Sequence, residues 1–179
     1  MAAFVSRGPR DTVRFAQKVL AQAKRRRVRP IILALSGELG SGKTTFVRGL
    51  AAALGIREKI QSPTFVLMRT YPIQKQFHHF HHFIHIDAYR LERPAEARRL
   101  GLADIFRDRD AVVVIEWAER IKKPIPQPAV WIYCKHGRKL QERIIEIKNK
   151  KSTFVPLSPR YHPGPEPRRM TGRGKSKNT

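Results

Sequence analysis

The segment from Gly37 to Thr45 carries residue types that bind phosphate groups in nucleotide-binding proteins. Its sequence, GELGSGKTT, fits the pattern G-x-x-x-x-G-K-[ST]. In this pattern the glycines let backbone N–H groups turn toward the phosphates, Lys43 reaches the β and γ oxygens, and the Thr44 hydroxyl is placed to bind Mg²⁺. The segment therefore predicts a nucleoside triphosphate site, and its nucleotide-binding residues are Leu39, Gly40, Ser41, Gly42, Lys43, Thr44 and Thr45.

The flanks of this segment predict the elements that must hold it. Residues 31–35 form a continuous apolar run, which is typical of a buried parallel strand. Residues 44–54 repeat apolar side chains about every 3.6 residues, which predicts a helix. A strand, a glycine-rich loop and a helix follow in the order that phosphate binding requires, so a chance glycine-rich turn is the less favoured interpretation.

Two acidic residues at the ends of apolar runs are candidates for the metal side of the site. Asp87 ends one such run, and Glu116 directly follows the stronger run 111–115. Nucleotide hydrolases of this kind hold Mg²⁺ with an acid at the end of a neighbouring strand. We predict Glu116 and Thr44 as metal ligands, and Asp87, Glu116 and Lys43 as catalytic residues. Asp87 is expected to complete the magnesium shell, to orient the attacking water or to accept its proton, and an ordinary exposed acid is the alternative for both acids.

Local patterns predict the remaining elements. Asp11 or Thr12 is expected to cap a first helix, which ends in a basic run. Pro63 is expected to set a turn, after which residues 64–67 form a strand. A short helix closed by glycine is predicted over 92–101.

A late antiparallel hairpin is predicted from the runs 131–134 and 143–147. Arg138 lies in its loop and either reaches a phosphate or sits in a solvated turn. Together the elements predict an α/β protein with the P-loop NTPase fold, in which helices flank a mostly parallel central sheet. We expect a P-loop domain over residues 1–150 of the 179. Residues 151–179 hold five prolines and seven Lys and Arg, and we predict that they form a disordered tail.

The chain is strongly basic and has one cysteine. It holds 37 Lys and Arg against 14 Asp and Glu, a net charge of +23, which favours a polyanionic partner such as RNA or DNA as much as it fits a generally basic composition. Because Cys134 is the only cysteine in the sequence, an internal disulfide framework and a cysteine-based metal site are both excluded. No run approaches the roughly 18 apolar residues of a membrane span, so we expect a cytoplasmic protein.

A histidine-rich segment runs from His78 to His82. We interpret it as a solvated loop rather than a zinc site, because no cysteine or acid accompanies it. His79 and His81 alternate along a possible strand, with His78 and His82 in its loop. His85 is different, because it lies two residues before Asp87 and shares its face of the strand.

ATP is the predicted nucleotide. Guanine specificity usually comes with an N-K-x-D segment, and the only Asn-Lys pair, at 149–150, lacks the acid. A small P-loop metabolite kinase stays open as an alternative, with the arginine-bearing helix 92–101 as its lid. A third interpretation is a nucleic-acid-binding protein in which ATP is regulatory.

Several motifs in a fixed order resemble the TsaE family, formerly called YjeE. After GELGSGKTTFVRGL come SPTF at 62–65, HIDAYRL at 85–91, LGL at 100–102 and IEWAE at 115–119. The resemblance covers residues from about 11 to 147. It implies an ATPase that uses Mg²⁺, is required for making threonylcarbamoyladenosine in tRNA, and works with the TsaD and TsaB proteins and through them with tRNA.

The resemblance also implies roles for individual residues. Lys43 and Thr44 would hold phosphate and Mg²⁺, Glu116 would be a magnesium ligand, and Asp87 would lie beside the nucleotide as the catalytic acid candidate. It further implies nucleotide contacts at Arg138 and, near adenine, Thr12, and a switch-like segment made of Ser62, Pro63 and Thr64. The chain departs from the family in its longer segment 74–82, in its basic tail and at Ala118, which replaces a frequent proline. None of these touches the phosphate chemistry.

Overall fold

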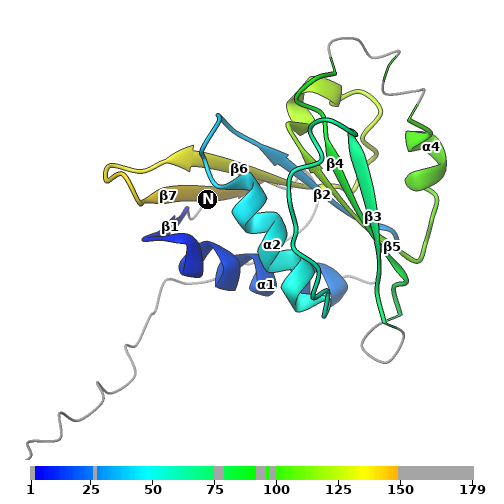
Figure 1. Ribbon diagram of the computed structural model, residues 1–179, viewed down its shortest axis with the longest axis horizontal. Helices are drawn as coiled ribbons and strands as arrows, with labels where there is room; N and C mark the ends of the chain where they lie inside the picture. Colours follow the sequence, from blue (N-terminus) through cyan, green and yellow to red (C-terminus); the bar gives the residue numbers. More distant parts are fainter. Residues whose placement is uncertain (1–2, 26–27, 75–78, 92–95, 97–99, 149–179) are drawn as a thin grey trace, which may run out of the picture.

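One mixed sheet organises the chain. The computed structural model describes residues 3–25, 28–74, 79–91, 96 and 100–148. Within them the sheet has seven strands in the order β1-β7-β6-β2-β5-β4-β3 (Figure 1). The strands are β1 (Phe4–Ser6), β2 (Ile31–Ser36), β3 (Met68–Pro72), β4 (His82–Asp87), β5 (Ala111–Glu116), β6 (Val130–His136) and β7 (Arg143–Lys148). The helical elements are α1 (Pro9–Arg25), α2 (Lys43–Ala53), α4 (Leu102–Ile105) and the 3-10 turn η1 (Ala118–Ile121).

The central strands of the sheet pair in parallel, and the outer strands on both sides pair antiparallel. β2 pairs in parallel with β5 and with β6, and β4 pairs in parallel with β5. The antiparallel pairs are β3 with β4, β6 with β7, and β1 with β7. The mixed α/β class, the mostly parallel centre and the late antiparallel hairpin are therefore confirmed.

Helical elements cover both faces of the sheet, because its central strands are apolar on both sides. In β5, Val112 and Val114 join the hydrophobic cluster that contains α1 and α2. Val113 and Ile115 join the cluster on the other face, which contains α4 and η1. Figure 1 shows α1 and α2 together on one side of the sheet and α4 on the other.

The parallel strands bring their carboxyl ends to one edge. Glu116 lies in register with Leu35 of β2 on one side and with Asp87 of β4 on the other. The connection between β3 and β4 leaves from the opposite edge, where Pro72 pairs with His82. The two acids and the loop after β2 therefore meet at one edge, as the strand pattern predicts.

The strand predicted over 64–67 is wrong. The N–H groups of Val66 and Leu67 both donate to the Pro63 carbonyl, at 3.0 and 2.6 Å, which closes a turn. Phe65 is 87% exposed, and pairing begins only at Met68. The proline turn thus continues through the apolar residues that suggested a strand.

The predicted start of the first helix is also wrong. α1 begins at Pro9, and the Gly8 carbonyl accepts hydrogen bonds from the N–H groups of Asp11 and Thr12 at 3.1 and 3.2 Å. Asp11 instead accepts a bond from the Arg7 N–H at 3.1 Å, from inside the first turn. Proline suits the first helical position because its missing N–H would have no partner there.

Some predictions fall where the structure describes little or nothing. The tail 151–179 and His78 lie outside the described residues, and so does most of the helix predicted over 92–101. His79 and His81 lie outside the strands, and His82 begins β4 rather than lying in a loop, which corrects the expected alternation. In the described ranges, no helix is long and apolar enough to cross a membrane.

Candidate functional site

The glycine-rich loop (residues 37–45) leaves β2 and leads directly into α2. Gly42 precedes α2 with a φ of 95°, and the first turn of the helix has no side-chain cap and no acid. Gly37 has a φ of 146°, and a Cβ there would lie 2.1 Å from the Cys134 carbonyl oxygen. The backbone can take this path only with glycine at these two positions. Because no side chain caps α2, its first N–H groups can bind an anion.

Lys43 lies almost buried under this loop. Its ammonium donates to the carbonyl oxygens of Gly37 and Glu38 at 2.7 and 2.8 Å. The same nitrogen lies 3.8 Å from the centre of the Trp117 ring. Burial lowers the pKa of Lys43, and the nearby Glu116 carboxylate partly opposes this shift. The lysine is thus held at the loop by two neutral carbonyl acceptors and an aromatic face. An anionic ligand can take the place of the two carbonyls.

Thr44 and Glu116 form the contact between α2 and β5. The Thr44 hydroxyl donates to Glu116 Oε2 at 2.8 Å. The other carboxylate oxygen, Oε1, lies 2.8 Å from Nε2 of His85, and both of these side chains are buried. The two residues predicted as metal ligands are therefore brought together.

Asp87 is held by a different set of partners. Its Oδ2 accepts hydrogen bonds from the hydroxyls of Ser62 and Thr64, the latter at 2.6 Å, and its Oδ1 accepts the Tyr89 N–H at 2.9 Å. The two hydroxyls also lie 3.0 Å from each other. The predicted switch-like segment 62–64 is thus tied to the predicted catalytic acid, and the acid faces away from bulk solvent.

Two further predicted nucleotide contacts are Thr12 and Arg138. Thr12 is buried in α1, where its hydroxyl lies 2.8 Å from that of Ser6. Arg138 is exposed in the hairpin loop. Leu39, by contrast, lies in the loop but its side chain is 79% exposed, so only its backbone is fixed there.

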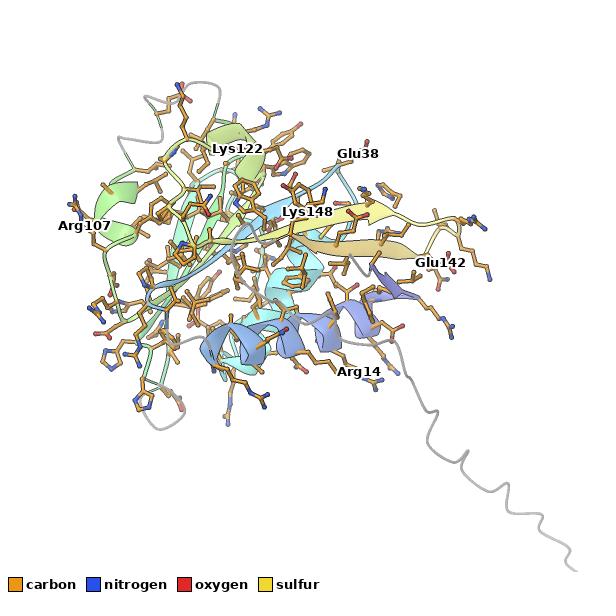
Figure 2. The ribbon with its side chains drawn as sticks, turned by 180° about the vertical axis from the view of Figure 1, so that it is seen from behind. Arg14, Glu38, Arg107, Lys122, Glu142 and Lys148 are labelled. Atoms are coloured by element: carbon orange, nitrogen blue, oxygen red, sulfur yellow. The ribbon has the colours of Figure 1, made fainter. Side chains whose placement is uncertain are left out.

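The hairpin contacts the glycine-rich loop through residues that the sequence did not single out. The Arg143 guanidinium donates from Nε to the Gly40 carbonyl at 2.9 Å. His136 Nε2 lies 3.0 Å from the Leu39 carbonyl. Figure 2 shows Glu38 at the outer tip of the loop and Glu142 at the end of the hairpin. Only the strand register reveals these contacts, because the partners are about 100 positions apart in the chain.

The arrangement offers hard oxygen donors but no closed metal cage. In the part of the chain that the structure describes, no group of three or more His, Cys, Asp or Glu could hold a metal ion. Mg²⁺ keeps several waters and phosphate oxygens and needs only one or two protein oxygens. The pair of Thr44 and Glu116 fits that ion, whereas zinc would need more protein ligands.

Known proteins resemble this chain in sequence and in backbone. The profile of the family described as "Threonylcarbamoyl adenosine biosynthesis protein TsaE" matches residues 6–145. The "tRNA threonylcarbamoyladenosine biosynthesis protein TsaE" of Bacillus subtilis is 33% identical over 73% of this chain and 72% of that protein. The protein of the same name from Treponema pallidum is 37% identical over 72% of this chain and 87% of that protein.

Two further similarities concern coverage and backbone. The protein of that name from Haemophilus influenzae is 35% identical, over 57% of this chain and 61% of its own length. The match thus spans less than two thirds of that relative. The solved structure described as "Crystal structure of Bacillus subtilus YdiB" has a TM-score of 0.62 and 29% identity, and the match covers 80% of this chain and 82% of that one.

Proposed function

This chain belongs to the TsaE family, and we propose that it binds and hydrolyses ATP in the biosynthesis of threonylcarbamoyladenosine in tRNA. The role in that biosynthesis follows from the family and from the names of the relatives. ATP hydrolysis is supported above all by the 2.8 Å contact between the Thr44 hydroxyl and the Glu116 carboxylate. It joins the start of α2 to the end of β5, where P-loop hydrolases hold their metal.

Phosphate binding is supported by the start of α2 and by Lys43. The free N–H groups of the helix and its dipole attract an anion. The hydroxyl of Ser41 is buried and has no partner within the described residues, so a phosphate oxygen would satisfy it. Lys43 would exchange the two carbonyls that it now contacts for phosphate oxygens, a stronger, charge-assisted interaction.

Thr44 and Glu116 would hold Mg²⁺. When bound, this ion would neutralise the negative charge that develops on the phosphate oxygens during transfer. Glu116 has both oxygens engaged, one by Thr44 and one by His85, so its carboxylate is already oriented. Little reorganisation is then needed when the ligand arrives.

Asp87 would orient the attacking water. Its Oδ2 accepts two hydroxyls from the segment 62–64, and either hydroxyl can be exchanged for a water molecule without moving the strand. Such an exchange would release the segment, which fits a switch that responds to the nucleotide. We propose TsaD and TsaB as the partners that sense this change, with tRNA reached through the complex.

The test is ATP hydrolysis measured with and without TsaB, TsaD and tRNA. Lys43→Ala and Glu116→Ala should each lower the rate by at least about 100-fold. Arg14→Ala and Asp104→Asn are matched controls, because both residues are exposed and Figure 2 shows Arg14 on the side of α1 away from the sheet. The controls should hydrolyse ATP like the wild type.

Two results would refute the proposal. One is a purified protein that binds no ATP. The other is unchanged threonylcarbamoyladenosine in the tRNA of cells that lack the chain. Transfer of the phosphate to a metabolite rather than to water would favour the kinase alternative.

A further inference from the structure

His85 is a buried polar residue that the hydrolysis proposed above places beside Glu116 but not in contact with the nucleotide or the metal. Its side chain is fully buried in β4, and its backbone is fixed between β3 and β5, in register with Arg69 and Val114. Its Nε2 lies 2.8 Å from Glu116 Oε1. Its other ring nitrogen, Nδ1, is buried and has no hydrogen-bond partner among the residues that the structure describes. A buried imidazole with one used and one unused nitrogen calls for an explanation.

The chemistry of the two groups decides which atom donates. A carboxylate only accepts hydrogen bonds, so the imidazole proton lies on Nε2 and is donated to Glu116. Nδ1 then carries a lone pair. Leaving that lone pair unpaired costs less than burying an unpaired N–H, because a proton on Nδ1 would leave both Nδ1–H and Glu116 Oε1 unsatisfied. The contact is therefore directional.

The direction of this bond bears on the orientation of Glu116. Rotation of a carboxylate about its last bond exchanges its two oxygens, and a single partner leaves that rotation free. In this site Oε1 is held by His85 and Oε2 by Thr44, each at 2.8 Å. Two partners on opposite oxygens leave one orientation, in which Oε2 faces the threonine hydroxyl.

We propose that His85 is a positioning residue, which donates from Nε2 to Glu116 and so holds the other carboxylate oxygen toward Thr44 for metal binding. This inference rests on the proposed function, because it assumes that Glu116 serves Mg·ATP. It gives the residue a task beyond filling the core. Partners that orient metal ligands typically change metal affinity or activity by about 10–100-fold when they are removed.

Two amide variants separate this task from core packing. The side-chain nitrogen of glutamine takes the place of Nε2, whereas that of asparagine takes the place of Nδ1, which has no partner here. His85→Gln should therefore recover most of the wild-type behaviour. His85→Asn should raise the Mg²⁺ concentration for half-maximal ATP hydrolysis by about 10-fold or more.

Phe83→Leu is the control for packing. Phe83 is buried on the same face of β4, two residues before His85, and belongs to the apolar cluster. This variant should lose stability and keep the wild-type Mg²⁺ requirement. ATP binding measured in EDTA should stay the same in all His85 variants that remain folded, because the proposed task concerns the metal side alone.

Several outcomes would overturn the positioning role. One is a His85→Asn protein with the wild-type Mg²⁺ requirement, and another is a His85→Gln protein as impaired as His85→Asn. If these variants do not fold, ¹⁵N NMR of the wild type decides, because the bond requires a proton on Nε2 and an Nε2 that carries no proton refutes it. Lys43→Ala separates the two proposals: if it hydrolyses ATP normally, the proposed function fails, and if it is inactive while His85→Asn is normal, only the role of His85 fails.

Discussion

Replacing Gly37 by alanine should destabilise the protein through the close approach of the glycine-rich loop to β6. The residue has a φ of 146°, and a Cβ would lie 2.1 Å from the Cys134 carbonyl oxygen. Strain at such a φ costs about 1–3 kcal/mol, and overpacking against backbone adds about 1–3 kcal/mol. The combined loss is about 2–6 kcal/mol, a large part of the roughly 5–15 kcal/mol that stabilises a typical domain.

Urea unfolding of three matched variants would resolve the two contributions. Gly101→Ala meets only the strain, because Gly101 has a φ of 65° and no atom within 4 Å of its Cβ position, and it should cost about 1–2 kcal/mol. Gly8→Ala meets neither, since no atom lies within 4 Å and no unusual φ is found there. Its free energy of unfolding should fall by less than about 1 kcal/mol, because Gly8 only precedes the first turn of α1.

The Gly37→Ala midpoint should fall by about 1–3 M urea for a slope of about 2 kcal/mol per M. A loss no larger than that of Gly101→Ala would refute the close approach. ATP binding should weaken as well in the Gly37 variant and not in the other two, because only Gly37 lies in the glycine-rich loop.

Four further predictions concern single contacts. Arg143→Ala removes the hydrogen bond to the Gly40 carbonyl and should raise the Kd for ATP about 2–10-fold in a titration, whereas an unchanged Kd would show that this bond does not help the loop to bind ATP. Thr64→Val should slow ATP hydrolysis with little change in the Kd, and equal effects on both would show that the hydroxyl serves binding. Burial raises the pKa of the Cys134 thiol to about 12, so a thiol reagent at pH 8 should label it only after unfolding, and rapid labelling of the native protein would contradict this burial. The hydrogen bond from His82 lowers the pKa of Asp108. This bond therefore stabilises the folded state at pH values above the ordinary pKa of an aspartate, and the stabilisation is lost as the pH falls through the lowered pKa. His82→Ala should therefore reduce the free energy of unfolding by less than about 1 kcal/mol at pH 5 and by less still at pH 3, as urea unfolding at the two pH values would show.

The chemistry-bearing strands could be predicted from the sequence because their signals are local. The apolar runs 31–35 and 111–115 are closely followed by Gly37 and Glu116 of the candidate site, and parallel strands bring such ends to one edge. The register of Asp87 with Glu116 follows from the same rule. Periodicity and strand ends were enough for this half of the site.

The remaining contacts could not be predicted because they depend on distant segments. His136 and Arg143 reach the glycine-rich loop only through the way that the hairpin pairs with β2 and with itself. The sequence pointed to Arg138, in the loop between them, because an arginine in a turn is a plausible phosphate ligand. Whether it contacts nucleotide stays a prediction.

Competition between a turn and a strand for the same backbone groups explains why the strand predicted over 64–67 does not form. The apolar residues 65–67 suggest a strand, but the Pro63 carbonyl takes two of their N–H groups into a turn. β1 is only three residues long and is held by pairing with β7, so it carries no pattern of its own. Short edge strands are specified by their neighbours rather than by their own sequence.

The connection between β3 and β4 leaves the sheet at the edge opposite to Asp87 and Glu116. The phosphate chemistry proposed for this chain therefore places little constraint on the length of that connection, since loop length adds only slowly to the entropy of closure. His79 and His81 lie in that connection. Over generations a lineage can therefore lengthen that connection and change its composition without altering the reaction proposed for the other edge.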